Sequence, residues 1–134
     1  LGLSTLQEAD IVIIGVSRVS KSPTTLYLGS RGVKAANVSI SPQTGFPAEL
    51  SKIPKNKIVA FTIQPKLLHE IRTDRARHLK AEGSSYEDLQ SVIREVMAAE
   101  AEYRRRRYPI IDVTKLTIEQ TIAQFPEKVK LRLE

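Results

Sequence analysis

The sequence has no cysteine and no tryptophan, and only 5% of its 134 residues are aromatic. The absence of cysteine excludes disulfide bonds and metal sites built from thiolates. No apolar run approaches the length of a membrane span, and the first residues lack the basic-then-apolar pattern of a secretory signal. We therefore expect a cytoplasmic protein with no membrane partner.

The charged residues are unevenly divided between the two signs. Lysine and arginine number 21 and aspartate and glutamate 15, which gives a net charge of 21 − 15 = +6. This excess favours anionic ligands, and nucleotide phosphates suit it as well as nucleic acid does. The hydrophobic content of 41% and the length are ordinary for a globular protein, so we expect residues 1–134 to form a single domain.

Short apolar runs alternate with segments of helical pattern along the whole chain. We expect strands at 10–14, 33–40, 58–63 and 108–113. We expect helices at 23–31, from Pro65 onward, from a capping box of Ser85 and Asp88 to about residue 107, and from Thr117 onward. Residues 41–57 hold three prolines and a glycine and are expected to be irregular. This alternation predicts an α/β fold with an open, mostly parallel sheet flanked by helices.

The segment between the first predicted strand and the first predicted helix has the pattern of a phosphate-binding P-loop. It reads Gly15, Val16, Ser17, Arg18, Val19, Ser20, Lys21 and Ser22. Backbone N–H groups of such a loop surround phosphate oxygens, the lysine reaches the outer phosphates, and the hydroxyl residue binds magnesium. Ser20 stands where the pattern has its second glycine. The alternative is an ordinary loop in which the residues before Pro23 simply begin a helix.

Two further residues are predicted at the same edge of the sheet as this loop. Thr62 ends the third expected strand and Asp112 ends the fourth. Ligands of parallel sheets bind at the carboxyl ends of the strands, so we expect both residues near the loop. Asp112 is a candidate magnesium ligand or a base toward an incoming hydroxyl. The alternative for Asp112 is an aspartate that caps the turn after its strand.

Two groups of arginines invite a functional interpretation. Arg72 and Arg75 share one face of the helix after the third strand and suit a phosphate clamp. Alternatively they lie on a solvated face and pair with Glu70 and Asp74. The run of four arginines at 104–107 sits at a helix end, where the helix dipole favours positive charge. Nucleic-acid binding is the less favoured interpretation of this run because no aromatic platform accompanies it.

Taken in order, several segments resemble one family: the bacterial and plant regulatory proteins of pyruvate, phosphate dikinase and of phosphoenolpyruvate synthase. The resemblance covers the chain from about residue 9 to about residue 125. It lies in residues 9–25 (ADIVIIGVSRVSKSPTT), 28–37, 61–65 (FTIQP), 71–75 (IRTDR), Tyr86, 108–114 (YPIIDVT) and 118–121. The P-loop followed by Pro-Thr-Thr is its most specific part, and serine at position 20 is a familiar variant in this family.

The resemblance implies a bifunctional enzyme with a P-loop fold. Such proteins use ADP to phosphorylate a threonine of the dikinase or synthase, which inactivates it, and remove that phosphate with inorganic phosphate to give pyrophosphate. Carried onto this chain, residues 15–22 bind ADP, Lys21 neutralises the transferring phosphate, and Ser22 holds Mg²⁺. Arg72 and Arg75 become phosphate clamps, and Asp112 becomes a magnesium ligand or base.

Two other functions are compatible with the same residues, and the length of the chain bears on all three. A P-loop kinase with a small-molecule acceptor would share the loop, and a non-catalytic phosphate- or nucleic-acid-binding module would use only the positive charge. Family members are about twice this length, so we expect the chain to be the carboxyl-terminal half of a longer protein. Its oligomeric state, with a homo-oligomer among the possibilities, is open.

Overall fold

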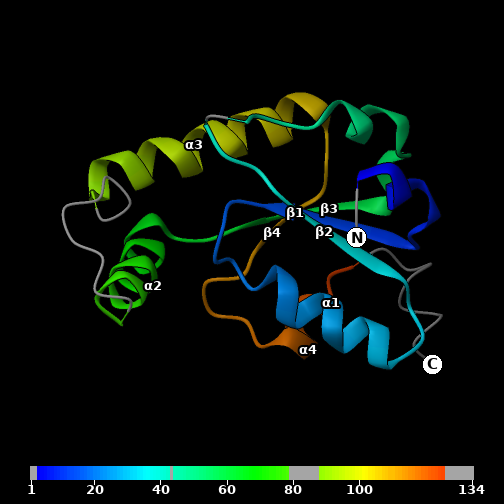
Figure 1. Cartoon of the computed structure of the whole chain (residues 1–134), viewed down its shortest axis with the longest axis horizontal. Helices are drawn as coiled ribbons and strands as arrows, with labels where there is room; N and C mark the ends of the chain where they lie inside the picture. The colour runs from blue at the N-terminus through cyan, green and yellow to red at the C-terminus, as the bar shows by residue number, and fades with distance from the viewer. Residues whose placement is uncertain (1–2, 43, 79–87, 126–134) are drawn as a thin grey trace.

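The computed structural model describes residues 3–42, 44–78 and 88–125. Within them, four strands form one sheet in the order β2-β1-β3-β4 (Figure 1). The strands are β1 (Ile11–Gly15), β2 (Ala35–Ser39), β3 (Ile58–Thr62) and β4 (Ile110–Asp112). All neighbouring strands run parallel. The predicted α/β class with an open parallel sheet is therefore confirmed.

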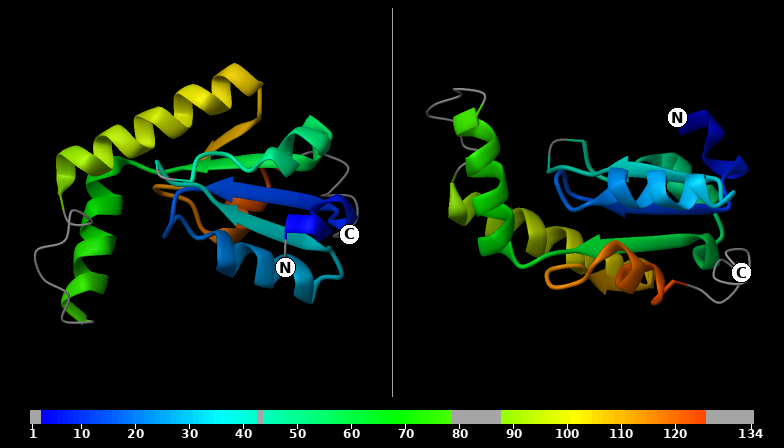
Figure 2. Two further views of the ribbon diagram at one scale, coloured as in Figure 1. Left: turned by 45° about the horizontal axis from the view of Figure 1, so that its top comes forward. Right: turned by 90° about the horizontal axis from the view of Figure 1, so that it is seen from below.

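Helices cover both faces of the sheet. They are α1 (Lys21–Ser30), α2 (Pro65–His78), α3 (Leu89–Arg106) and α4 (Ile118–Ile122), with three short 3₁₀ helices, η1 (Leu3–Glu8), η2 (Ala48–Lys52) and η3 (Lys55–Lys57). Figure 1 shows α1 and α4 below the sheet and α3 above it. Figure 2 shows α2 beyond the end of the strands, where it packs against α3. This leaves α2 and α3 beside the loops at the carboxyl edge.

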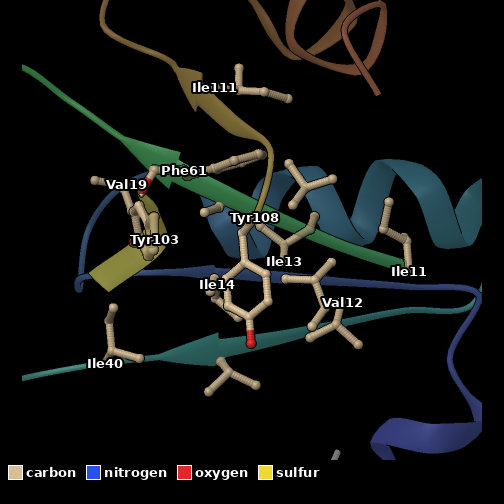
Figure 3. Packing of buried hydrophobic residues seen from close by; sticks show 14 of the residues in the cluster. Ile11, Val12, Ile13, Ile14, Val19, Ile40, Phe61, Tyr103, Tyr108 and Ile111 are labelled. Carbon is tan, nitrogen blue, oxygen red and sulfur yellow. Dashed lines mark hydrogen bonds between the residues drawn. The ribbon is translucent and has the colours of Figure 1, made fainter. Parts of the chain in front are cut away.

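The two central strands are buried along their whole length. Every residue of β1 and β3 is buried, whereas the edge strands β2 and β4 alternate between buried and more exposed positions. Helices on both faces explain the continuous apolar runs at 11–14 and 58–61, because both sides of these strands face the core. The core continues into α3 through Tyr103, whose hydroxyl donates a 3.1 Å hydrogen bond to the Phe61 carbonyl (Figure 3).

Some element boundaries differ from those predicted. Helix α1 begins at Lys21 rather than at Pro23, since a residue in the first turn needs no intrahelical partner for its N–H. Helix α3 begins at Leu89, and the Asp88 carboxylate caps it by accepting from the Gln90 N–H at 3.0 Å. The predicted cap Ser85 lies outside the described residues. The segment expected to be irregular contains η2 and η3.

The sheet order sets the distance between the predicted site residues. Gly15, Thr62 and Asp112 each end a strand at the carboxyl edge, and Thr62 is paired in register with Asp112. Strand β3 lies between β1 and β4, so the loop after β1 is two strand spacings, roughly 10 Å, from Asp112.

In the described part of the chain, no helix combines the length and the apolar character that a membrane crossing requires.

Candidate phosphate-binding site

The loop after β1 folds back closely over the end of its own strand. A Cβ atom at Gly15 would lie 2.9 Å from the Val19 side chain and 3.3 Å from the Phe61 carbonyl oxygen. Glycine is therefore required at position 15 by the close approach of the loop and of β3. The loop lines a pocket of about 420 Å³ with residues 17–23, Asn37, Ser39 and Ile71. The predicted loop thus forms an open concavity where β1 meets α1.

Two residues of the loop adopt the left-handed backbone conformation. Arg18 has φ 71°, and Ser20, which immediately precedes α1 and makes no side-chain capping hydrogen bond, has φ 57° and ψ 24°. This conformation explains why the P-loop pattern has glycine at the position of Ser20, since glycine adopts it without steric cost. A non-glycine residue held there is strained, and such strain is concentrated at functional sites. Alternation of left-handed and right-handed residues also turns successive N–H groups toward one concave side, which suits an anion.

Lys21 occupies an unusual position for a lysine. It is the first residue of α1, only 5% exposed, and its ammonium group donates a 2.6 Å hydrogen bond to the Val16 carbonyl. Burial, together with the nearby Arg72 and Arg18 cations, lowers the pKa of Lys21 to about 8. Glu95 only partly offsets this lowering of the pKa, and an anion bound in the pocket would further stabilise the charged ammonium form.

Arg72 is anchored within the protein. Its guanidinium makes a two-pronged ion pair with Glu95 of α3, at 2.7 and 3.1 Å, and donates to the Ser17 hydroxyl at 3.0 Å and to the Ser17 carbonyl at 3.2 Å. Arg72 is 2% exposed, so it lies on no solvated face, and these contacts are not with Glu70 or Asp74. In this arrangement Arg72 holds the loop from α2 and α3. We call these three residues the Arg72–Glu95–Ser17 anchor.

Of the other predicted site residues, Asp112 lies apart from the loop. The exposed Asp112 accepts hydrogen bonds from the backbone N–H and the hydroxyl of Thr114, which is the turn-capping arrangement considered for it. It lines a separate pocket of about 480 Å³, together with Glu100 and Thr114. Thr62 donates a 2.6 Å hydrogen bond to Glu100. Arg75 lies in α2, but its side chain is outside the described residues. The roles proposed for Asp112 and Arg75 stay predictions.

The loop pocket suits a magnesium ion that arrives with a nucleotide. Its hydroxyl and amide groups come from Ser17, Ser20, Ser22, Asn37 and Ser39, and the described residues contribute no carboxylate to it. In the same part of the chain, no cluster of three histidine, aspartate or glutamate residues is placed to hold a metal. Mg²⁺ at nucleotide sites takes most of its ligands from phosphates and water. Ser22 therefore fits as a single protein ligand to a nucleotide-bound ion.

Sequence reasoning missed the partners that the tertiary structure brings to this site. Glu95 lies in the middle of α3, where its position resembles that of other charged residues on the helix. Asn37 and Ser39 alternate with buried residues in β2 and so have the pattern of an exposed strand face. Only the P-loop motif itself carried a local signal, because its chemistry depends on consecutive residues.

Comparison with known proteins agrees with this geometry. A family model described as kinase/pyrophosphorylase matches residues 2–125. The chain belongs to the kinase/pyrophosphorylase family. The match includes the whole sheet, the loop at 15–22 and all four α-helices within the described residues. The resemblance drawn from the sequence is therefore confirmed.

Relatives within this family have a common description. A protein of Desulfitobacterium hafniense is 40% identical over 120 residues, and one of Rhodospirillum rubrum is 39% identical over 128 residues; both carry the name "Putative pyruvate, phosphate dikinase regulatory protein". These alignments cover 89% and 95% of this chain but only 44% and 46% of the relatives. The chain thus spans a little under half the length of these relatives.

Proposed function

We propose that this chain carries the phosphoryl-transfer site of a regulatory enzyme that acts on pyruvate, phosphate dikinase or on phosphoenolpyruvate synthase. In one direction the enzyme uses ADP to phosphorylate a threonine of the target and inactivates it. In the other direction it removes that phosphate with inorganic phosphate. The family description supports phosphate chemistry, and the names of the relatives support the dikinase as target.

The observation that carries this proposal is the buried Lys21 at the base of a P-loop in which Arg18 and Ser20 have left-handed backbone conformations. The pocket walls bring two cations, Lys21 and Arg18, and no carboxylate among the described residues. Phosphoryl transfer requires mainly positioning and neutralisation of charge on the phosphate oxygens. A lysine at the first residue of a helix supplies both the position and the positive charge. Because it is shielded from water, its electrostatic attraction for a phosphate oxygen is stronger than it would be in solvent.

The two reactions balance as follows. In the forward direction the threonine oxygen bonds to the β-phosphorus of ADP, the bond from that phosphorus to the bridging oxygen breaks, AMP leaves, and the threonine proton passes to a base. In the reverse direction an oxygen of inorganic phosphate bonds to the phosphothreonine phosphorus, the bond from that phosphorus to the threonine oxygen breaks, pyrophosphate leaves, and the threonine oxygen takes a proton from the protonated base. Lys21 neutralises the moving phosphoryl group in both directions, and a bound Mg²⁺ would neutralise further phosphate charge. Asp112 is the proposed base or magnesium ligand on the acceptor side.

The test is transfer of label from ADP carrying a labelled β-phosphate. We expect the chain with magnesium to label a threonine of the dikinase or of the synthase, and we expect Lys21→Ala to abolish the labelling. Circular dichroism of Lys21→Ala checks that the fold is intact. The full-length Desulfitobacterium relative is assayed in parallel, to show that the target preparation can be phosphorylated. Full activity of Lys21→Ala would show that the mechanism is wrong.

The remaining outcomes separate the other functions. If the relative labels the target and this chain does not, the chain does not carry the transfer activity by itself and the proposal fails for it. If the chain releases AMP only with small-molecule acceptors, it is a metabolite kinase. If ADP raises the melting temperature and no transfer to any acceptor occurs, it is a phosphate-binding module.

A further inference from the structure

A second pocket borders the loop on the α3 side of the sheet. It has a volume of about 300 Å³ and is lined by apolar groups of Val16, Ile40, Phe46, Ala98 and Ala99. Val16 is the loop residue whose carbonyl accepts the hydrogen bond from Lys21, and Ser17, the next residue, lines the phosphate pocket. Consecutive residues of one loop therefore line the two pockets. We call the second one the base pocket.

The two pockets differ in the charged side chains that line them. The phosphate pocket contains Arg18 and Lys21 and no carboxylate among the described residues, whereas the base pocket contains Glu95 and Glu102, with Arg106 as its only cation there. The Arg106 side chain already pairs with Glu102 at 2.5 Å. Glu102 also pairs with Arg105, and Glu95 pairs with the buried Arg72, so these carboxylates act here as hydrogen-bond acceptors rather than as unpaired negative charges. A neutral group that donates hydrogen bonds is favoured there, because carboxylate oxygens are acceptors.

The base pocket also has an aromatic wall that is fixed in place. Phe46 is partly buried, its ring meets Tyr103 edge-on with centroids 5.9 Å apart, and the Arg106 guanidinium lies 4.6 Å from its centroid. Aromatic rings and guanidinium planes are the surfaces on which nucleobases stack. The volume is at the lower end of the range for small-molecule pockets, roughly 300 to 1,000 Å³, and so suits part of a ligand.

We propose that the base pocket binds the adenine base of the nucleotide whose phosphates lie on the loop. This inference rests on the proposed function. The anionic end of the nucleotide lies among the cations of the phosphate pocket, and the base lies between apolar walls. The exocyclic amino group of adenine donates to a carboxylate of Glu95 or Glu102. The base pocket thereby distinguishes a nucleoside diphosphate from inorganic phosphate and pyrophosphate, which occupy the loop alone.

The first experiment fills the base pocket without touching the loop. Ala98 is exposed on α3 and lines the pocket, and Ala101 is exposed on the same helix and does not line it. Ala98→Leu and Ala101→Leu are therefore matched variants, since leucine and alanine are both good helix formers. Calorimetry measures the affinity of each variant for ADP and for pyrophosphate. Thermal unfolding without ligand checks that both variants are folded.

We expect Ala98→Leu to weaken ADP binding at least about tenfold and to leave pyrophosphate binding within about twofold of the parent chain. Ala101→Leu should change neither. If pyrophosphate binds normally while the affinity for ADP is the same in all three proteins, the assignment of adenine to the base pocket is wrong and the phosphate site on the loop stands. If neither ligand binds the parent chain, the proposed function fails and this inference fails with it.

A second experiment tests the hydrogen bond to the carboxylate. Inosine diphosphate differs from ADP in carrying a carbonyl oxygen where adenine has its amino group. That oxygen would face a carboxylate, so we expect inosine diphosphate to bind at least about tenfold more weakly than ADP. In Ala98→Leu this difference should shrink, since neither base can enter. Equal affinities of the parent chain for the two nucleotides would overturn the assignment of the carboxylate contact.

Discussion

Lys21 shows at the scale of one residue how stability and function oppose each other in this loop. Its side chain is buried, donates its hydrogen bond to the neutral Val16 carbonyl, and lies near the cations of Arg72 and Arg18. The pKa falls to about 8 because burial penalises the ammonium form. The folded chain therefore binds this proton more weakly than the unfolded chain, for which the pKa is 10.5. At neutral pH the folded state bears the cost of a charge that an anionic ligand would stabilise.

We predict that Lys21→Met stabilises the chain at pH 7. Methionine fills similar space without a charge. After allowance for the lost hydrogen bond to Val16, the free energy of unfolding should rise by on the order of 2 kcal/mol. Between about pH 8 and 10.5 the unfolded parent chain holds more protons than the folded one, so its free energy of unfolding rises with pH. The advantage of Lys21→Met should shrink over this window. Urea unfolding of both proteins at several pH values measures it, and a difference that stays constant with pH would contradict the prediction.

The Arg72–Glu95–Ser17 anchor leads to a second prediction for single residues. Arg72→Met leaves Glu95, whose side chain is only 14% exposed, without its cation, and should cost about 3 kcal/mol. Adding Glu95→Leu removes the unpaired charge and should restore much of this loss. Arg72→Met should also weaken pyrophosphate binding, because Ser17 has lost its hydrogen-bond donor. This weakening should remain in the double variant. Urea unfolding and calorimetry give the two readouts. Recovery of binding together with stability would show that the anchor is merely structural.

At the scale of elements, short helices depend on their caps and on what they pack against. Helix α4 has only five residues, and Thr117 and Gln120 form a capping box at its start: the Thr117 hydroxyl accepts from the Gln120 N–H at 3.1 Å, and the Gln120 side chain accepts from the Thr117 N–H at 2.9 Å. A helix this short is unstable alone. It persists because Thr121 and Ile122 are buried and because the helix packs against α1.

We predict that Thr117→Ala destabilises the chain by about 1 kcal/mol, since one N–H of the first turn loses its acceptor. Thr117→Ser keeps the hydroxyl and should remain close to the parent chain. Because no described residue of α4 lines the loop pocket, pyrophosphate affinity should not change in either variant. Thermal unfolding and calorimetry measure the two quantities, and equal stability of the alanine and serine variants would refute the role of the cap.

At the scale of the whole molecule, the excess of positive charge acts over longer distances than any contact. The net charge of +6 attracts phosphate ligands from solution, and salt screens this attraction over a Debye length of about 10 Å at 0.1 M. At the end of α3, Arg105 and Arg106 pair with Glu102, which offsets part of their contribution to this long-range field. Arg104, Arg105 and Arg107 are exposed, as expected for a solvated helix end, whereas the half-buried Arg106 lies over the Phe46 ring.

We predict that ADP and pyrophosphate bind more weakly as sodium chloride rises from about 0.05 to 0.5 M, chiefly through slower association. Adenosine, which has no charge, serves as the control and should bind with an affinity that salt leaves unchanged. Stopped-flow measurement of association rates separates the effect of salt on encounter from its effect on release. An association rate for ADP that is independent of salt would exclude a role for the net charge.

The sequence alone determined the features that depend on neighbouring residues. Apolar runs placed β1 and β3, the P-loop motif placed the concavity at residues 15–22, and the pair of Thr117 and Gln120 placed the start of α4. The family followed from such segments in order. Each of these signals is local, because hydrogen bonds and backbone conformations within a few residues produce it.

Only the tertiary structure decided which distant side chains meet. Arg72 has the sequence pattern of an exposed helical cation, yet it is buried because α3 brings Glu95, 23 residues away, to its side. Asp112 ends a strand at the same edge as the loop, yet the insertion of β3 between β1 and β4 separates the two. Strand order and helix packing arise from burial of apolar surface, which has no direction along the chain. Such contacts therefore leave no local pattern from which they could be predicted.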